Sequence, residues 1–92
     1  MLTQAAKDKA KAFLGEEITQ TELRLYPYLD YCWKNGGYVD RGKLSGDEQD
    51  IIDRREEQGH LERVWGGYNL PTRAFYDFVQ DILAECYVVF KE

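Results

Sequence analysis

Histidine, cysteine and proline are scarce in this chain of 92 residues, which has one histidine, two cysteines and two prolines. A structural zinc site usually takes four cysteine and histidine ligands, and neither a CxxC pair nor a second histidine is present. Cys32 and Cys86 lie far apart on apolar helical faces, which favours two buried, reduced thiols over a disulfide. We therefore expect no metal and no cofactor.

Long hydrophobic runs are also missing. No stretch of about 18 apolar residues occurs, so the sequence predicts no membrane span. The first 17 residues carry Lys7, Asp8, Lys9 and Lys11 where a signal peptide would be apolar. Export is therefore not expected, and the sequence predicts a cytoplasmic protein.

Positive charge is in short supply. Twelve lysines and arginines stand against 17 acidic residues, giving a net charge of −5. Nonspecific DNA binding depends on clustered cations that neutralise phosphates, so the overall charge argues against a nucleic-acid partner. A local basic patch can still exist on an acidic protein, which leaves the question open.

Apolar and aromatic residues are plentiful, at 43% and 14% of the chain. This composition can build a hydrophobic core and does not resemble that of a disordered chain. Because separate cores need roughly 50 residues or more each, we expect a single domain over residues 1–92.

The first half of the chain predicts two helices. Residues 3–14 form a thin, alanine-rich apolar stripe, which indicates a peripheral N-terminal helix within 1–15. Thr19 and Glu22 make a capping box that opens a second helix. Pro27 falls inside this helix, where it either kinks the helix or begins a new one.

A very short strand is expected at 38–40, and residues 41–44 have room for one turn. Ser45 and Glu48 form another capping box, opening a helix that ends near Gln58. After it, "HLERVWGGYNL" predicts a hairpin with Gly66-Gly67 as a two-residue turn, which would place Trp65 opposite Tyr68.

The last helix, over residues 72–90, has an apolar stripe wide enough to face two neighbours. A homodimer through this helix is therefore one prediction. The predicted fold class is mainly α with a small β-hairpin, that is α+β.

In this order the elements from residue 19 to 90 resemble a winged-helix module, with helices flanking it at both ends. The stretch "EEQGHLERVWGGYNLPTRAFYDF" carries the resemblance, since a helix ends at glycine, a hairpin follows, and a threonine opens the next helix. Many winged-helix proteins bind DNA, and others bind only proteins, so the resemblance implies a macromolecule-binding role without choosing the partner.

The residues after the short turn favour a protein partner. The helix in the position that reads DNA is "GDEQDIIDRREEQ", with six acidic residues against two arginines. It offers either an acidic docking surface or a merely solvated face. Trp65 and Tyr68 at the wing either bind a partner or brace the hairpin and pack on the last helix. The candidate partner-binding residues are Asp47, Asp50, Arg54, Trp65 and Tyr68.

The alternative is a dimeric DNA-binding transcriptional regulator. Its phosphate contacts would be Lys43, Arg54, Arg55, Arg63 and Arg73. Two of these lie late in the acidic helix, whereas helix-turn-helix proteins usually read bases from the first turns.

Catalysis is not expected. Cys32 and His60 could pair as nucleophile and base, but no local signature supports that pairing. The glycine-rich stretches lack the lysine of a phosphate-binding loop. We expect a small, acidic, non-enzymatic interaction or regulatory protein, a kind that is common in phages and mobile elements.

Overall fold

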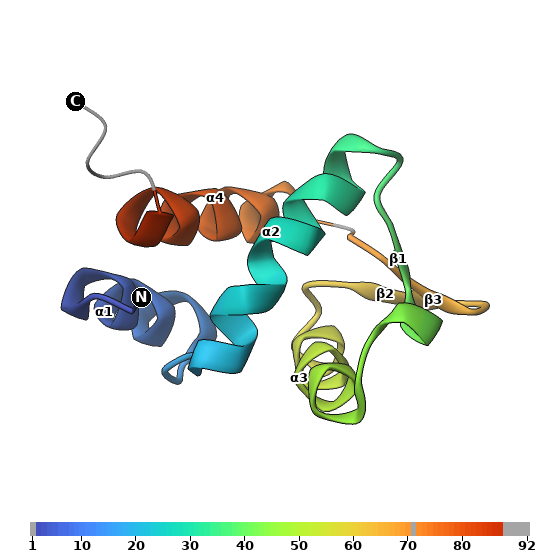
Figure 1. The fold of residues 1–92 in the computed structure, drawn as a ribbon, viewed down its shortest axis with the longest axis horizontal. Coiled ribbons are helices and arrows are strands. Elements are labelled where there is room, and N and C mark those ends of the chain that lie inside the picture. The colour runs from blue at the N-terminus through green and yellow to red at the C-terminus, as the bar shows by residue number, and fades with distance from the viewer. Residues whose placement is uncertain (1, 71, 88–92) are drawn as a thin grey trace.

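The computed structural model describes residues 2–70 and 72–87, with the side chain of Tyr87 excepted. The helices are α1 (Gln4–Leu14), α2 (Gln20–Lys34), α3 (Gly46–Glu57) and α4 (Arg73–Tyr87), with a 3-10 turn at Arg41–Lys43. The strands are β1 (Tyr38–Asp40), β2 (Glu62–Val64) and β3 (Gly67–Asn69). Helices α1 and α4 lie at one end of the molecule and the sheet at the other (Figure 1). The predicted class, mainly α with a small β-sheet, is confirmed.

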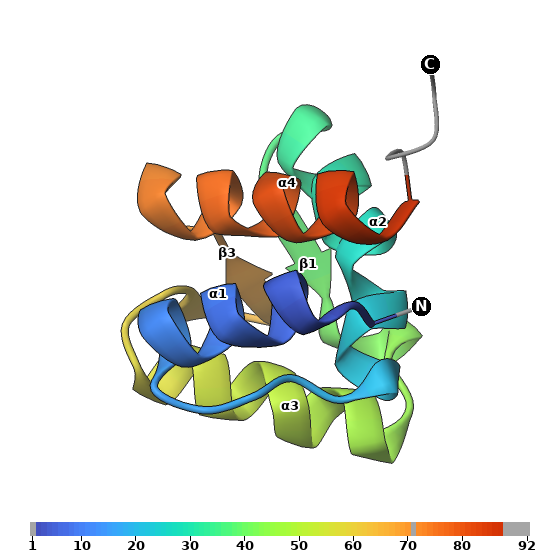
Figure 2. The same cartoon turned by 90° about the vertical axis from the view of Figure 1, so that its left-hand side faces the viewer.

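Helix α1 is more deeply packed than its thin stripe indicates. Thr3 caps its start by accepting a hydrogen bond from the backbone of Ala6. Ala6 and Ala10 are fully buried, and the helix lies alongside α4 (Figure 2). Small side chains let two helices approach closely, so alanines contribute to the core here. The expectation of a peripheral helix therefore underestimated its burial.

Helix α2 runs without a break from Gln20 to Lys34, so Pro27 does not split it into two helices. Thr19 caps the helix as expected, accepting from the backbone of Glu22. The reciprocal half of the predicted capping box is absent from the hydrogen bonds of the described residues. The Glu22 side chain instead points inward, where it accepts hydrogen bonds from Tyr26 and Arg55.

A buried ion pair joins α3 to α2. Arg55 donates from Nε and Nη2 to the two carboxylate oxygens of Glu22, at 2.8 and 2.7 Å. The two residues are only 3% and 2% exposed. Glu16, in the loop after α1, accepts from Arg55 Nη1 at 2.6 Å, and Tyr26 donates to Glu22 at 2.7 Å. The bidentate geometry and these extra hydrogen bonds offset the cost of burying both charges.

The short strands form one antiparallel sheet in the order β1-β3-β2. Val39 and Tyr68 are paired across β1 and β3, and both are fully buried. The one-turn helix and the Ser45–Glu48 capping box were both predicted correctly.

Helix α4 closes the core. Thr72 caps it as expected, accepting from the backbone of Phe75. Its buried residues, Phe75, Phe78, Val79 and Ile82, belong to one cluster with residues of α1 and α2. The wide stripe therefore has two neighbours within the chain. The homodimer stays a prediction, and the residues 88–90 assigned to it lie outside the described part.

Both cysteines are free thiols, Cys32 buried and Cys86 half-buried. Within the described part of the chain, none of the helices has the length and apolar content needed to cross a membrane.

Replacing Arg55 by methionine should lower the free energy of unfolding by about 3 kcal/mol, because it leaves the Glu22 carboxylate buried without its counter-ion. The measurement is urea denaturation followed by circular dichroism. Arg54→Met is the matched control: Arg54 also contacts Glu16, at 2.9 Å, but is largely exposed. It should cost under about 1 kcal/mol. Equal losses of unfolding free energy in the two variants would show that the buried pair contributes no more stability than an exposed one.

Candidate functional site

The hairpin turn is made by Trp65 and Gly66. Val64 pairs with Gly67 and Arg63 with Tyr68, so the turn lies one residue earlier than the predicted Gly66-Gly67. Gly66 has a φ of 80°, which fits the third position of a type II turn. The expected cross-strand pair of Trp65 and Tyr68 does not form, because Trp65 belongs to the turn itself.

Close backbone packing explains why Gly67 is in the strand. A Cβ atom added to Gly67 would lie 2.0 Å from the carbonyl oxygen of Val39, so only glycine fits. The Tyr38 side chain lies beside the same glycines, its hydroxyl 2.9 Å from a Cβ built on Gly66. In addition, the Arg41 amide donates to the Gly66 carbonyl at 3.1 Å. The tip of the hairpin is therefore held from two sides.

Beneath the hairpin, Asp53 on α3 binds three side chains. Tyr68 donates its hydroxyl to Asp53 Oδ1, Arg63 donates to the same oxygen at 2.9 Å, and Arg41 donates to Oδ2 at 3.3 Å. Arg41 also donates from Nε to the Tyr68 hydroxyl at 3.1 Å. Burial, together with the hydrogen bond to Asp53, raises the pKa of Tyr68 to about 12.

This arrangement changes the role of Tyr68. The residue was a candidate for partner binding, but it is 0% exposed and its hydroxyl is engaged by Asp53 and Arg41. Tyr68 instead braces the hairpin, which was the alternative to partner binding in the sequence analysis. The prediction that Tyr68 contacts a partner is therefore wrong. The turn lies one residue earlier than expected, and the Tyr68 side chain lies in the core.

Trp65 behaves in the opposite way. It is 96% exposed, so it neither braces the hairpin nor packs on α4. Beside it a shallow hollow of about 360 Å³ is lined by Arg41, Gly42, Gln49, Arg63, Val64, Gly66 and Gly67. Tyr38, which is 43% exposed, lies next to the same glycines. We call Trp65, Tyr38 and this hollow the wing site.

The outer face of α3 carries exposed acidic residues. Asp47 and Asp50 are exposed, and the ion pairs of the described residues include neither of them. Arg54 lies four residues after Asp50 on α3, but it binds Glu16 at 2.9 Å instead of Asp50. Ion pairs within the described residues therefore do not neutralise Asp47 and Asp50, as expected both for an acidic docking surface and for a solvated face.

The cations assigned to DNA are mostly engaged by carboxylates. Arg55 is buried against Glu22, and it was wrongly expected to be available to phosphates. Burial lowers the pKa of the Arg55 guanidinium, but Glu22 and Glu16 outweigh this and hold it above its usual value. The remaining arginines assigned to DNA also have partners: Arg54 with Glu16, Arg63 with Asp53 and Glu56, and Arg73 with Asp77. Lys43 is exposed in the 3-10 turn.

His60 and Cys32 have separate surroundings. The imidazole of His60 stacks between the rings of Phe13 and Phe75, with centroid distances of 4.8 and 5.2 Å. Burial and the nearby Arg55 lower its pKa. Burial likewise raises the pKa of the Cys32 thiol, which disfavours the nucleophilic thiolate. Among residues 2–70 and 72–87, no group of three or more potential ligands is placed to hold a metal ion.

Comparison with protein-family models, with curated proteins and with solved structures finds no match to this chain. The winged-helix resemblance stays a prediction.

The contact between Asp53 and Arg41 was not predicted from the sequence. Asp53 lies in an acidic run and Arg41 in a short turn, 12 positions apart. Neither helical nor strand periodicity relates the two residues. Only the packing of α3 against the sheet brings them together.

Replacing Asp53 by asparagine should lower the free energy of unfolding by about 1–2 kcal/mol, because a charged acceptor shared by three donors becomes a neutral amide. Thermal unfolding measures the change. Asp50→Asn, on the exposed face of the same helix, should stay within about 0.5 kcal/mol of the wild type. If both variants are equally stable, Asp53 does not hold the hairpin in place.

Proposed function

We propose that the chain is a small, acidic, non-enzymatic protein-binding module whose principal contact is the wing site. The observation that carries this proposal is the exposure of Trp65 on a braced turn. Tryptophan buries a large area at a low entropic cost and is enriched among residues that dominate binding energy. A tryptophan that the fold leaves in water is available for a partner.

The bracing of the turn strengthens this argument. Binding energy is lost when a contact residue must first be ordered, so a rigid support raises affinity. Gly67 packs against Val39, and the Arg41 amide fixes the Gly66 carbonyl. Through Asp53 the hairpin is also tied to α3. The tip is thus held in place before a partner arrives.

The chemistry around Trp65 indicates the kind of partner surface. Arg41 and Arg63 line the hollow beside the tryptophan. A partner with an apolar pocket would take the indole, and its edge would face Arg41 and Arg63, whose charges are already balanced by Asp53. The acidic face of α3, with Asp47 and Asp50, supplies a second contact suited to basic residues. A regulatory protein of winged-helix topology in the cytoplasm fits this description.

The charge distribution supports a protein partner over DNA. Counterion release requires cations that are free to meet phosphates. Arg54, Arg55, Arg63 and Arg73 would first have to leave carboxylates, and those carboxylates would then repel the duplex. DNA is therefore a less suitable partner than a protein.

Trp65→Ala should reduce partner binding at least tenfold without changing the melting temperature, because the residue contributes little to the core. Proteins retained from a lysate of the native host by immobilised wild type and variant are compared by quantitative mass spectrometry. Tyr31→Ala, which removes a 62% exposed aromatic on α2, is the control and should retain the wild-type set. Equal retention by Trp65→Ala and wild type would rule out the wing tip as the contact.

A labelled random-sequence duplex should show no micromolar binding at physiological salt, and little at low salt, because most arginines already have carboxylate partners. Fluorescence anisotropy measures this directly. Strong binding at low salt that falls steeply with added salt would favour the DNA-binding regulator instead. In that case Arg63→Ala should reduce the slope of the salt dependence.

A further inference from the structure

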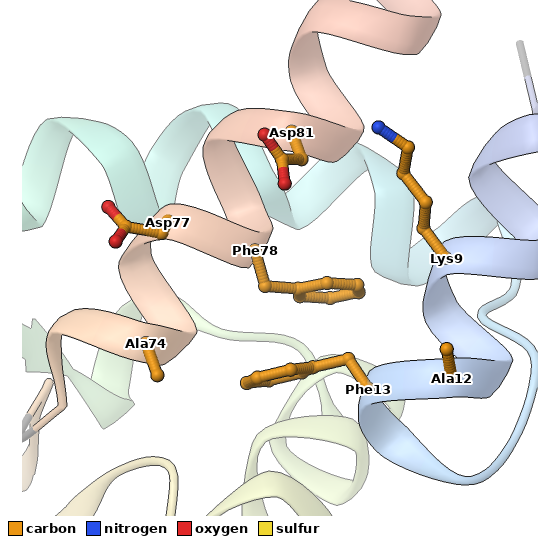
Figure 3. A pocket seen from close by; sticks show the side chains of 7 residues that line it. All are labelled: Lys9, Ala12, Phe13, Ala74, Asp77, Phe78 and Asp81. Carbon is orange, nitrogen blue, oxygen red and sulfur yellow. The ribbon is translucent and has the colours of Figure 1, made fainter.

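A second hollow, of about 500 Å³, opens between α1 and α4. Figure 3 shows its lining, with Lys9, Ala12 and Phe13 on α1 and with Ala74, Asp77, Phe78 and Asp81 on α4. We call it the α1–α4 groove. It lies in the helical end of the molecule, whereas the wing projects from the other end (Figure 1).

The floor of the groove is aromatic. The rings of Phe13 and Phe78 stack with centroids 4.7 Å apart, and both point into the space between the helices (Figure 3). Phe13 also stacks on His60, which in turn stacks on Phe75. Ala12 and Ala74 flank these rings with single methyl groups, so the space beside the rings stays open. Such a floor suits an apolar side chain from outside.

One edge of the groove is acidic. Asp77 and Asp81 lie one turn apart on α4, and Lys9 stands on the opposite side (Figure 3). Asp77 binds Arg73 at 3.0 Å, and Lys9 binds Glu85 at 3.5 Å. No ion pair among the described residues involves Asp81. Exposed pairs of this kind are weak, so both aspartates can accept a new cation at little cost.

We propose that the α1–α4 groove docks a short amphipathic helix of a partner protein that carries a basic flank. Its apolar side chains would cover the exposed methyl groups of Ala12 and Ala74, the half-buried ring of Phe13, and the edge of Phe78, which is only 5% exposed. Lysines or arginines spaced four residues apart would then face Asp77 and Asp81, because the two acids are separated by the same helical repeat. Laying an amphipathic helix into an apolar groove is a common mode of protein recognition. The site is separate from the wing site and does not depend on it.

The test uses a dye-labelled, end-capped peptide of about four turns, with leucines on one face and lysines at positions i and i+4 beside them. Its anisotropy is followed as protein is added, and ¹⁵N spectra locate the contact. The expected result is binding, with shifts at the groove and not at the wing. No binding at about 1 mM protein would overturn the proposal, as would equal binding of the peptide with glutamates in place of lysines.

Matched variants distinguish peptide binding at the groove from attraction by the net negative charge of the protein. Asp81→Asn should weaken binding about threefold to fivefold, the effect of one exposed ion pair. Glu62→Gln changes the net charge equally but lies exposed on β2, outside the lining of the groove, and it should leave affinity unchanged. Equal weakening by both variants would show that only bulk charge attracts the peptide, which contradicts the proposal.

A second pair of variants tests the apolar floor. Ala74→Trp fills the groove and should abolish binding, whereas Gln20→Trp places a tryptophan at an exposed position of α2, outside the lining of the groove, and should leave binding unchanged. Sedimentation velocity of the protein without peptide completes the test. If it shows a dimer that Ala74→Trp converts to a monomer, the occupant is a second copy of this chain and the proposed occupant is wrong.

Discussion

The buried ion pair between Arg55 and Glu22 is the interaction on which the arrangement of this protein depends. It joins α3 to α2, and through Glu16 it also fixes the loop that follows α1. A bidentate pair demands a defined geometry, which a sliding apolar contact does not. Helix α3 has few apolar residues of its own to hold it in place. Its orientation is therefore set by a charge, and the hairpin is positioned in turn by Asp53 on that helix.

This use of charge shapes the outer surface. The arginines of α3 and of the hairpin bind carboxylates of their own chain, so their positive charge is largely neutralised internally. Asp47 and Asp50, by contrast, point outward and keep their charge. The solvent-facing side of α3 is consequently more acidic than the numbers of acidic residues and arginines in this helix suggest. Helix α3 thus presents exposed acidic side chains to solvent, while its buried arginine faces the core.

The aromatic residues have two roles, one in the core and one at the surface, and the path of the backbone decides which residue has which role. Phe13, His60, Phe75 and Phe78 form a continuous stack that closes the core and floors the α1–α4 groove. Trp65 is left in water by a turn that lies between β2 and β3. The core therefore does not need this tryptophan, and its exposure carries the proposed function. The two surfaces lie at opposite ends, so a partner at one leaves the other open.

The sequence by itself determined the helices, their caps and the presence of a hairpin, because capping boxes, glycine stops and apolar periodicity act over a few residues. It also indicated Trp65 as a candidate contact. Tertiary structure decided the turn register, since the close approach of Val39 requires glycine at 67. It likewise decided which charges are buried, because Glu22 and Arg55 are 33 positions apart. Local rules predicted Glu22 as a capping residue, and a stronger, distant partner took its side chain into the core.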